Sequence, residues 1–66
     1  MSDLDWFYIV AHWCEDRGLD LGEIVETLDK TPSYLTAHEQ FAQGASTRVL
    51  EQLLDAARLE MTRGKG

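Results

Sequence analysis

The sequence contains one cysteine, Cys14, and one proline, Pro32, among its 66 residues. A single cysteine excludes an internal disulfide, and no set of cysteines and histidines has zinc-site spacing. No apolar run approaches the ~20 residues that cross a bilayer, and the acidic start Met1-Ser2-Asp3-Leu4-Asp5 is unlike a signal peptide. We therefore expect a soluble cytoplasmic protein with no cofactor, no metal and no membrane contact, stabilised by its apolar core and by dimerisation if it forms a homodimer.

Basic residues are scarce as well, since six Lys and Arg stand against twelve Asp and Glu, for a net charge of −6. The charges are unevenly distributed. Residues 1–29 carry eight acids and one base, Arg17, whereas residues 30–66 carry four acids and five bases. Nucleic-acid-binding proteins usually present a basic face, because phosphate contacts supply most of the affinity. Only the second half of this chain offers such a face, and it is small.

Apolar periodicity predicts a first helix that begins at Ser2 or Asp3 and ends at Arg17-Gly18. Trp6, Val10 and Trp13 recur at helical spacing and should anchor the core. Phe7 widens this buried stripe, and Tyr8 lies at its edge.

Two short helices should follow. Asp20 caps the first of them, which ends at Asp29, a residue that tolerates a left-handed turn. Thr31 caps the second, with Pro32 at its first position. The residues expected in the core are Ile24, Val25, Leu28, Leu35 and His38, with Tyr34 and Phe41 on the flanks.

Gly44 ends the third helix, and Ser46 caps a fourth. The inward residues of this last helix are Val49, Leu50, Leu53, Leu54, Ala57 and Met61. We expect an all-α, compact four-helix domain over residues 1–62, with a flexible C-terminal tail at residues 63–66.

The stretch from Leu19 to Ser46 has the outline of a helix-turn-helix. In and around it stand Arg17-Gly18-Leu19, the apolar set Ile24, Val25 and Leu28, the run Thr31-Pro32-Ser33-Tyr34-Leu35-Thr36, then Glu39, Ser46, Leu50 and Leu53. In their order and spacing these segments resemble the Cro/repressor class of helix-turn-helix domains, also called XRE-like. This resemblance implies a lambda-repressor-like fold with a central helix-turn-helix, lacking the fifth helix that many members have.

The resemblance also implies a small transcriptional regulator whose third helix enters the major groove of a double-stranded DNA operator. The implied DNA-binding residues are Lys30, Thr31, Ser33, Tyr34, Thr36, Ala37 and Arg48. The contact positions depart from the family pattern: Leu21 replaces a frequent glutamine, and Ala37 stands where an arginine or lysine is common. None of the offered side chains makes the bidentate contact by which Arg reads guanine or Gln reads adenine.

A second interpretation assumes the same fold without DNA binding. An acidic helix-turn-helix-like protein would bind a basic regulatory protein and inhibit it, as an antiactivator or antirepressor does. The residues expected to contact such a partner are Tyr8, Glu23, Glu26, Tyr34 and Phe41.

Catalysis is the least favoured class. His12 and Cys14 are two residues apart and therefore lie on different faces of a helix. We interpret His12 as a surface residue and Cys14 as half-buried, and we expect no catalytic residue.

Overall fold

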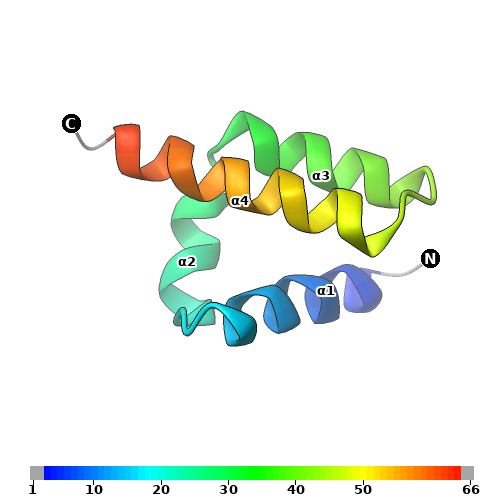
Figure 1. The fold of residues 1–66 in the computed structure, drawn as a ribbon, viewed down its shortest axis with the longest axis horizontal. Helices are drawn as coiled ribbons and strands as arrows, with labels where there is room; N and C mark the ends of the chain where they lie inside the picture. Colours follow the sequence, from blue (N-terminus) through cyan, green and yellow to red (C-terminus); the bar gives the residue numbers. More distant parts are fainter. Residues whose placement is uncertain (1–2, 65–66) are drawn as a thin grey trace.

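The computed structural model describes residues 3–64, which form four α-helices joined by short connections (Figure 1). Their bounds are α1 Asp3–Asp16, α2 Leu21–Leu28, α3 Pro32–Ala42 and α4 Thr47–Gly64. No strand occurs within residues 3–64, so the all-α prediction with four helices is confirmed. None of these helices is both long enough and apolar enough to cross a membrane. The last helix includes Arg63 and Gly64, which the sequence assigned to a tail.

Local signals in the sequence account for most helix ends. Gly18 and Gly44 adopt left-handed backbone conformations, with φ of 66° and 87°, after α1 and α3. The Asp20 carboxylate accepts hydrogen bonds from the backbone N–H groups of Gly22 (2.9 Å) and Glu23 (3.4 Å), which caps α2. The Ser46 hydroxyl likewise accepts from the N–H of Val49 at 3.4 Å and caps α4.

The turn between α2 and α3 differs from the prediction in two respects. Asp29 has right-handed backbone angles, φ −52° and ψ −22°, so no left-handed residue is used there. Thr31 occupies the N-cap position of α3, but its side chain is buried and donates to the carbonyl oxygen of Leu28 at 2.8 Å. The hydroxyl therefore closes the turn from α2 instead of capping α3.

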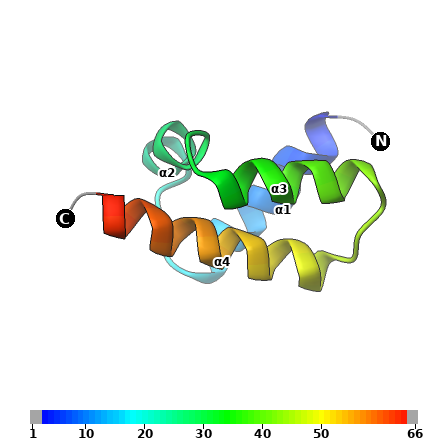
Figure 2. The same ribbon diagram turned by 90° about the horizontal axis from the view of Figure 1, so that it is seen from above.

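The helices form two layers. α3 and α4 run side by side and antiparallel in one layer, and α1 lies across the other (Figures 1 and 2). α2 connects the two layers at one end of the molecule and contacts both α1 and α4. The radius of gyration is 11.0 Å, close to the roughly 10.8 Å typical of a folded domain of this length.

The core lies between these layers. Its buried apolar residues are Trp6, Val10, Trp13, Cys14, Leu28, Tyr34, Ala37, Phe41, Leu50, Leu54 and Ala57. Half-buried Ile24, Val25, Leu53 and Met61 pack against it. The predicted inward stripe of α1 is confirmed for Trp6, Val10 and Trp13.

The prediction for α3 is wrong in register. Tyr34, Ala37 and Phe41 are buried, whereas Leu35 is 58% exposed and His38 is also exposed. Moving the buried set by one residue turns a helix by about 100°. The large rings at 34 and 41 gain aromatic contacts with Trp6 in the core, and Leu35 is left outside.

Two further apolar residues expected in the core are on the surface. Val49 is 41% exposed because α4 buries Leu50, Leu54 and Ala57 instead, a set at helical spacing. Phe7 is 49% exposed and does not widen the buried stripe of α1.

Candidate protein-interaction surface

The N-terminal half of α1 is held against α3 by the Trp6 side chain. Its indole Nε1 donates a hydrogen bond to the hydroxyl oxygen of Tyr34 at 3.0 Å. The Trp6 ring also lies 5.6 Å from the ring of Tyr34, 5.2 Å from that of His38 and 5.4 Å from that of Phe41, between centroids. Burial raises the pKa of the Tyr34 phenol and outweighs the opposite effect of the Trp6 hydrogen bond. Tyr34 therefore stays a neutral partner for the indole.

The C-terminal end of α1 is held against α4 by a polar cluster around Asp55. Arg17 contacts both carboxylate oxygens, with Nε 2.6 Å from Oδ1 and Nη2 2.9 Å from Oδ2. The indole of buried Trp13 donates to Oδ1 at 2.9 Å, and the Arg17 guanidinium lies 5.3 Å from the centre of the Trp13 ring. The hydrogen bond from Arg17 holds the pKa of Asp55 below its usual range against the effect of burial. Arg17 is thus committed to an internal ion pair.

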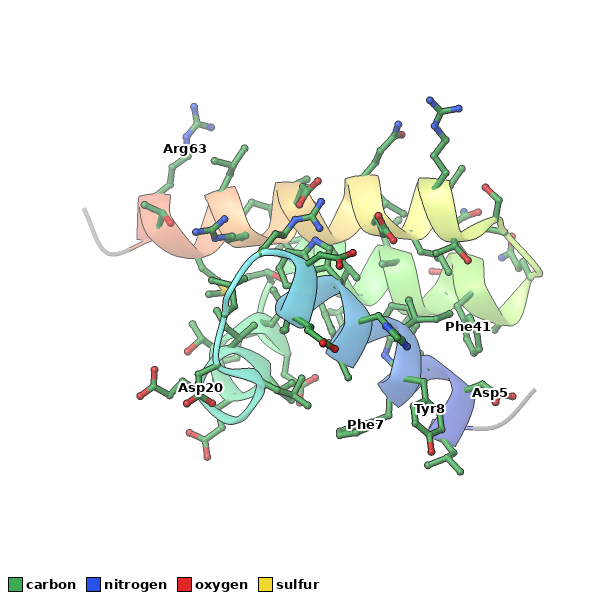
Figure 3. All side chains as sticks on the ribbon, turned by 60° about the horizontal axis from the view of Figure 1, so that its bottom comes forward. Asp5, Phe7, Tyr8, Asp20, Phe41 and Arg63 are labelled. Carbon is green, nitrogen blue, oxygen red and sulfur yellow. The ribbon has the colours of Figure 1, made fainter. Side chains whose placement is uncertain are left out.

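Fixing α1 at both ends determines which side chains it presents to solvent. Leu4, Phe7 and Tyr8 are 61%, 49% and 56% exposed. Figure 3 shows Phe7 and Tyr8 projecting outward from the N-terminal half of α1. Half-buried Ala11 lies one turn beyond Phe7. We call these four residues the α1 stripe: Leu4, Phe7, Tyr8 and Ala11, spaced i, i+3, i+4 and i+7.

Acidic side chains are exposed throughout the α1–α2 half of the molecule. They are Asp5, Glu15, Asp16, Asp20, Glu23, Glu26 and Asp29. The sole Lys or Arg of residues 3–29 is Arg17, which is bound to Asp55. This half therefore presents a negative surface, and the α1 stripe lies within it.

The residues expected to contact DNA are not gathered on one exposed face. Thr31, Tyr34 and Ala37 are buried, contrary to the expectation that they face outward. Lys30, Thr36 and Arg48 are exposed, but the Thr36 hydroxyl donates to the carbonyl oxygen of Pro32 at 3.0 Å. Leu35 and Glu39 are exposed on α3 instead, and exposed His38 lies at the edge of the buried face, against the Trp6 ring.

Ser33, the remaining predicted contact, is engaged by an acidic residue. Its hydroxyl donates to Glu60 Oε2, and its backbone N–H donates to Glu60 Oε1 at 3.3 Å. The Glu60 carboxylate thus occupies the N-terminal end of α3, where unpaired N–H groups favour an anion. A phosphate approaching this end of α3 would meet a carboxylate already in place.

The residues expected to contact a protein are divided between surface and core. Tyr8, Glu23 and Glu26 are exposed as required, whereas Tyr34 and Phe41 are buried. Sequence reasoning missed Leu4 and Phe7 as surface residues. The spacing of Leu4, Phe7 and Ala11 is itself an apolar helical stripe, offset from the Trp6, Val10 and Trp13 stripe, and that second pattern could have identified them.

The Cys14 thiol is buried, and residues 3–64 contain no cluster of metal ligands. Cys14 is 1% exposed, and burial raises the pKa of its thiol with a further contribution from Asp20, which disfavours the reactive thiolate. No three His, Cys, Asp or Glu side chains of the described residues are placed to hold a metal ion. One hollow, of about 420 Å³, is lined by Asp55, Arg58, Leu59 and Thr62.

All four of those lining residues belong to α4, so the hollow is a depression on one helix surface and not a cleft between elements. The candidate site is therefore a surface: an apolar stripe on α1 set in an acidic half of the domain. No protein-family model matches this chain, and no curated protein or solved structure matches it significantly.

Proposed function

We propose that this chain is a small acidic regulator that binds a basic surface of another regulatory protein and inhibits it, without binding DNA. The observation that carries the proposal is the exposure of seven acidic side chains across residues 5–29, while Arg17 is paired internally with Asp55. A surface of one sign raises the encounter rate with a partner of opposite sign and discriminates against other proteins.

The geometry of α3 supports a protein partner over DNA. A helix that reads the major groove needs polar side chains on its outer face near its N-terminus. In this chain Tyr34 and Ala37 are buried, and Leu35 is exposed in their place. Glu60 further adds negative charge beside Ser33. Phosphate would be repelled there, since DNA binding depends on neutralising phosphates with Lys and Arg.

Inhibition would follow because this chain and nucleic acid compete for the same basic side chains of the partner. A basic regulatory protein that contacts nucleic acid does so through exposed Lys and Arg side chains. An acidic surface that docks on those side chains covers them and removes the positive potential on which nucleic-acid binding depends. The chain would therefore act by occupying the partner's own binding surface.

The test identifies the partner and then reconstitutes the complex. The tagged intact chain is crosslinked in its native cells, the crosslinked protein is identified by mass spectrometry, and the two purified proteins are titrated. We expect direct binding that weakens with added salt and weakens roughly tenfold or more in Glu23→Lys/Glu26→Lys. The matched control is Glu39→Lys, at an exposed acid on the outer face of α3, which should bind within about twofold of wild type.

Two results would contradict the proposal. One is that no crosslinked protein binds the purified chain directly. The other is that the purified chain retards a DNA duplex and that Lys30→Glu abolishes the retardation.

A further inference from the structure

We infer that the α1 stripe is the docking site for an amphipathic basic helix of the partner protein. This inference rests on the proposed function in one respect, namely that the partner is positively charged. The location of the docking site on α1 is a separate claim, because the acidic surface of α2 alone could also attract a basic protein. The residues that would contact the partner helix are Leu4, Phe7, Tyr8 and Ala11.

The stripe is a concentrated apolar surface, unlike the other exposed apolar residues. Leu35, Val49 and Leu59 are also more than 40% exposed, but they lie singly on α3 and at separate points of α4. Single exposed apolar residues are normal on a protein surface, whereas a contiguous group marks an interaction site. Phe7 and Tyr8 are also aromatic, the side-chain class enriched among the residues that dominate binding energy.

The spacing of the stripe fits a helix better than an extended segment. Positions 4, 7, 8 and 11 repeat the i, i+3, i+4, i+7 pattern by which two packed helices interdigitate their side chains. Ala11 is small, which lets the axis of a second helix approach closely at that end. A partner helix presenting apolar residues at the same spacing would cover the stripe.

The position of α1 is already fixed in the free protein. Trp6 donates a hydrogen bond to Tyr34 at one end of α1. At the other end, Trp13 and Arg17 donate hydrogen bonds to Asp55. The backbone positions of Leu4, Phe7 and Tyr8 on α1 are therefore set before a partner arrives. Pre-organisation of this kind reduces the entropy lost on association.

Charge selects a basic helix over a second copy of this chain. α1 contains four acidic residues, Asp3, Asp5, Glu15 and Asp16, and no lysine or arginine. Pairing the stripes of two copies would bring exposed Glu15 and Asp16 of each near the acids of the other, between molecules of net charge −6. A helix with lysine or arginine beside its apolar face would meet those acids favourably.

The experiment uses a synthetic probe of defined pattern. A fluorescein-labelled 14-residue peptide of leucine and lysine, arranged so that leucine forms one helical face, is titrated with the intact chain and followed by anisotropy. The control peptide has the same composition with leucine spread over all faces. We expect the patterned peptide to bind, and Phe7→Ser/Tyr8→Ser to weaken it roughly tenfold or more.

The matched control variant is Leu59→Ser, because Leu59 is 67% exposed, more than any other large apolar side chain of the described residues, and lies on α4. It should bind the patterned peptide within about twofold of wild type. Circular dichroism of each variant establishes that the helices are retained, as expected for substitutions at exposed positions.

The inference is overturned if Phe7→Ser/Tyr8→Ser binds like wild type, if Leu59→Ser weakens binding equally, or if the scrambled peptide binds as well as the patterned one. Peptide binding lost only in Glu23→Lys/Glu26→Lys would refute the α1 stripe and leave the proposed function standing. A wild-type dimer in sedimentation that Phe7→Ser/Tyr8→Ser dissociates would assign the stripe to a second copy and refute the basic helix. Failure of the identified partner itself to bind would instead refute the proposed function.

Discussion

The indole nitrogen of Trp6 lies 3.0 Å from the hydroxyl oxygen of Tyr34, so a residue of the first helix is bonded to a residue of the third across 28 positions of sequence. Together with the ring contacts of Trp6 to Tyr34 and Phe41, this hydrogen bond holds α1 against α3. In this packing Tyr34 lies in the core and Leu35 on the surface of α3, while Phe7 and Tyr8 are exposed on α1. The same packing thus leaves Leu35 exposed on α3 and an apolar surface on α1.

Tyr34→Phe should destabilise the fold by about 1 to 3 kcal/mol, because it keeps the ring but leaves the buried Trp6 N–H without an acceptor. Urea unfolding followed by tryptophan fluorescence measures this loss. Tyr8→Phe removes the hydroxyl of an exposed tyrosine and should change the unfolding free energy by less than about 0.5 kcal/mol. Equal effects of the two substitutions would contradict a structural role for the Trp6–Tyr34 bond.

The ion pair between Arg17 and Asp55 should make stability depend on pH in the acidic range. The pKa of Asp55 is lower in the folded protein than its unfolded value near 3.9. The stabilisation is therefore fully present above about pH 5 and is lost as pH falls through the folded pKa. Asp55→Asn should cost about 1 kcal/mol at pH 7, since both side chains are partly exposed, and the difference from wild type should shrink below about pH 4.

Thermal unfolding at several pH values checks this expectation, with Glu26→Gln as the control at an exposed acid. A gap between wild type and Asp55→Asn that stays constant down to pH 2 would exclude the ion pair as its source. Asp55→Ala should cost more than Asp55→Asn, because the asparagine keeps an oxygen for the buried Trp13 indole and the alanine does not.

Glu60 should stabilise α3 from outside that helix. Glu60→Ala removes the charged acceptor at the N-terminus of α3 and should lower the unfolding free energy by about 1 kcal/mol. Glu39→Ala, at an exposed acid of α3 itself, should change it by less than about 0.5 kcal/mol. The hydrogen-exchange rate of the Ser33 amide reports on this contact directly, since the Ser33 N–H donates to Glu60. Unchanged exchange in Glu60→Ala would show that the carboxylate does not cap the helix.

The features that could be predicted from sequence are those set by local chemistry. Gly18, Asp20 and Ser46 mark helix ends through their own backbone or side-chain preferences, and the Trp6, Val10 and Trp13 spacing identifies the inner face of α1. The face of α3 could not be predicted in the same way. Leu35 and Tyr34 are adjacent, and both suit a core; only the tertiary partner Trp6 decides between them.

The polar contacts between helices were likewise beyond sequence reasoning. Nothing near Ser33 indicates that Glu60 caps it, and Arg17 gives no sign that Asp55 is its partner, because these pairs are separated by 27 and 38 positions. The negative charge of the candidate site could be predicted from the eight acids of residues 1–29. Its apolar part was not recognised, because Phe7 was assigned to the buried face.

The most direct test of the α1 stripe is an NMR titration of the ¹⁵N-labelled intact chain with the patterned leucine–lysine peptide. We predict that the largest backbone shift changes fall at residues 4–11, with smaller changes at the exposed acids of α2 and none of comparable size at residues 35–39. Changes that are largest on the outer face of α3 or around Leu59, or that appear with a DNA duplex at the same salt concentration and not with the peptide, would contradict the account.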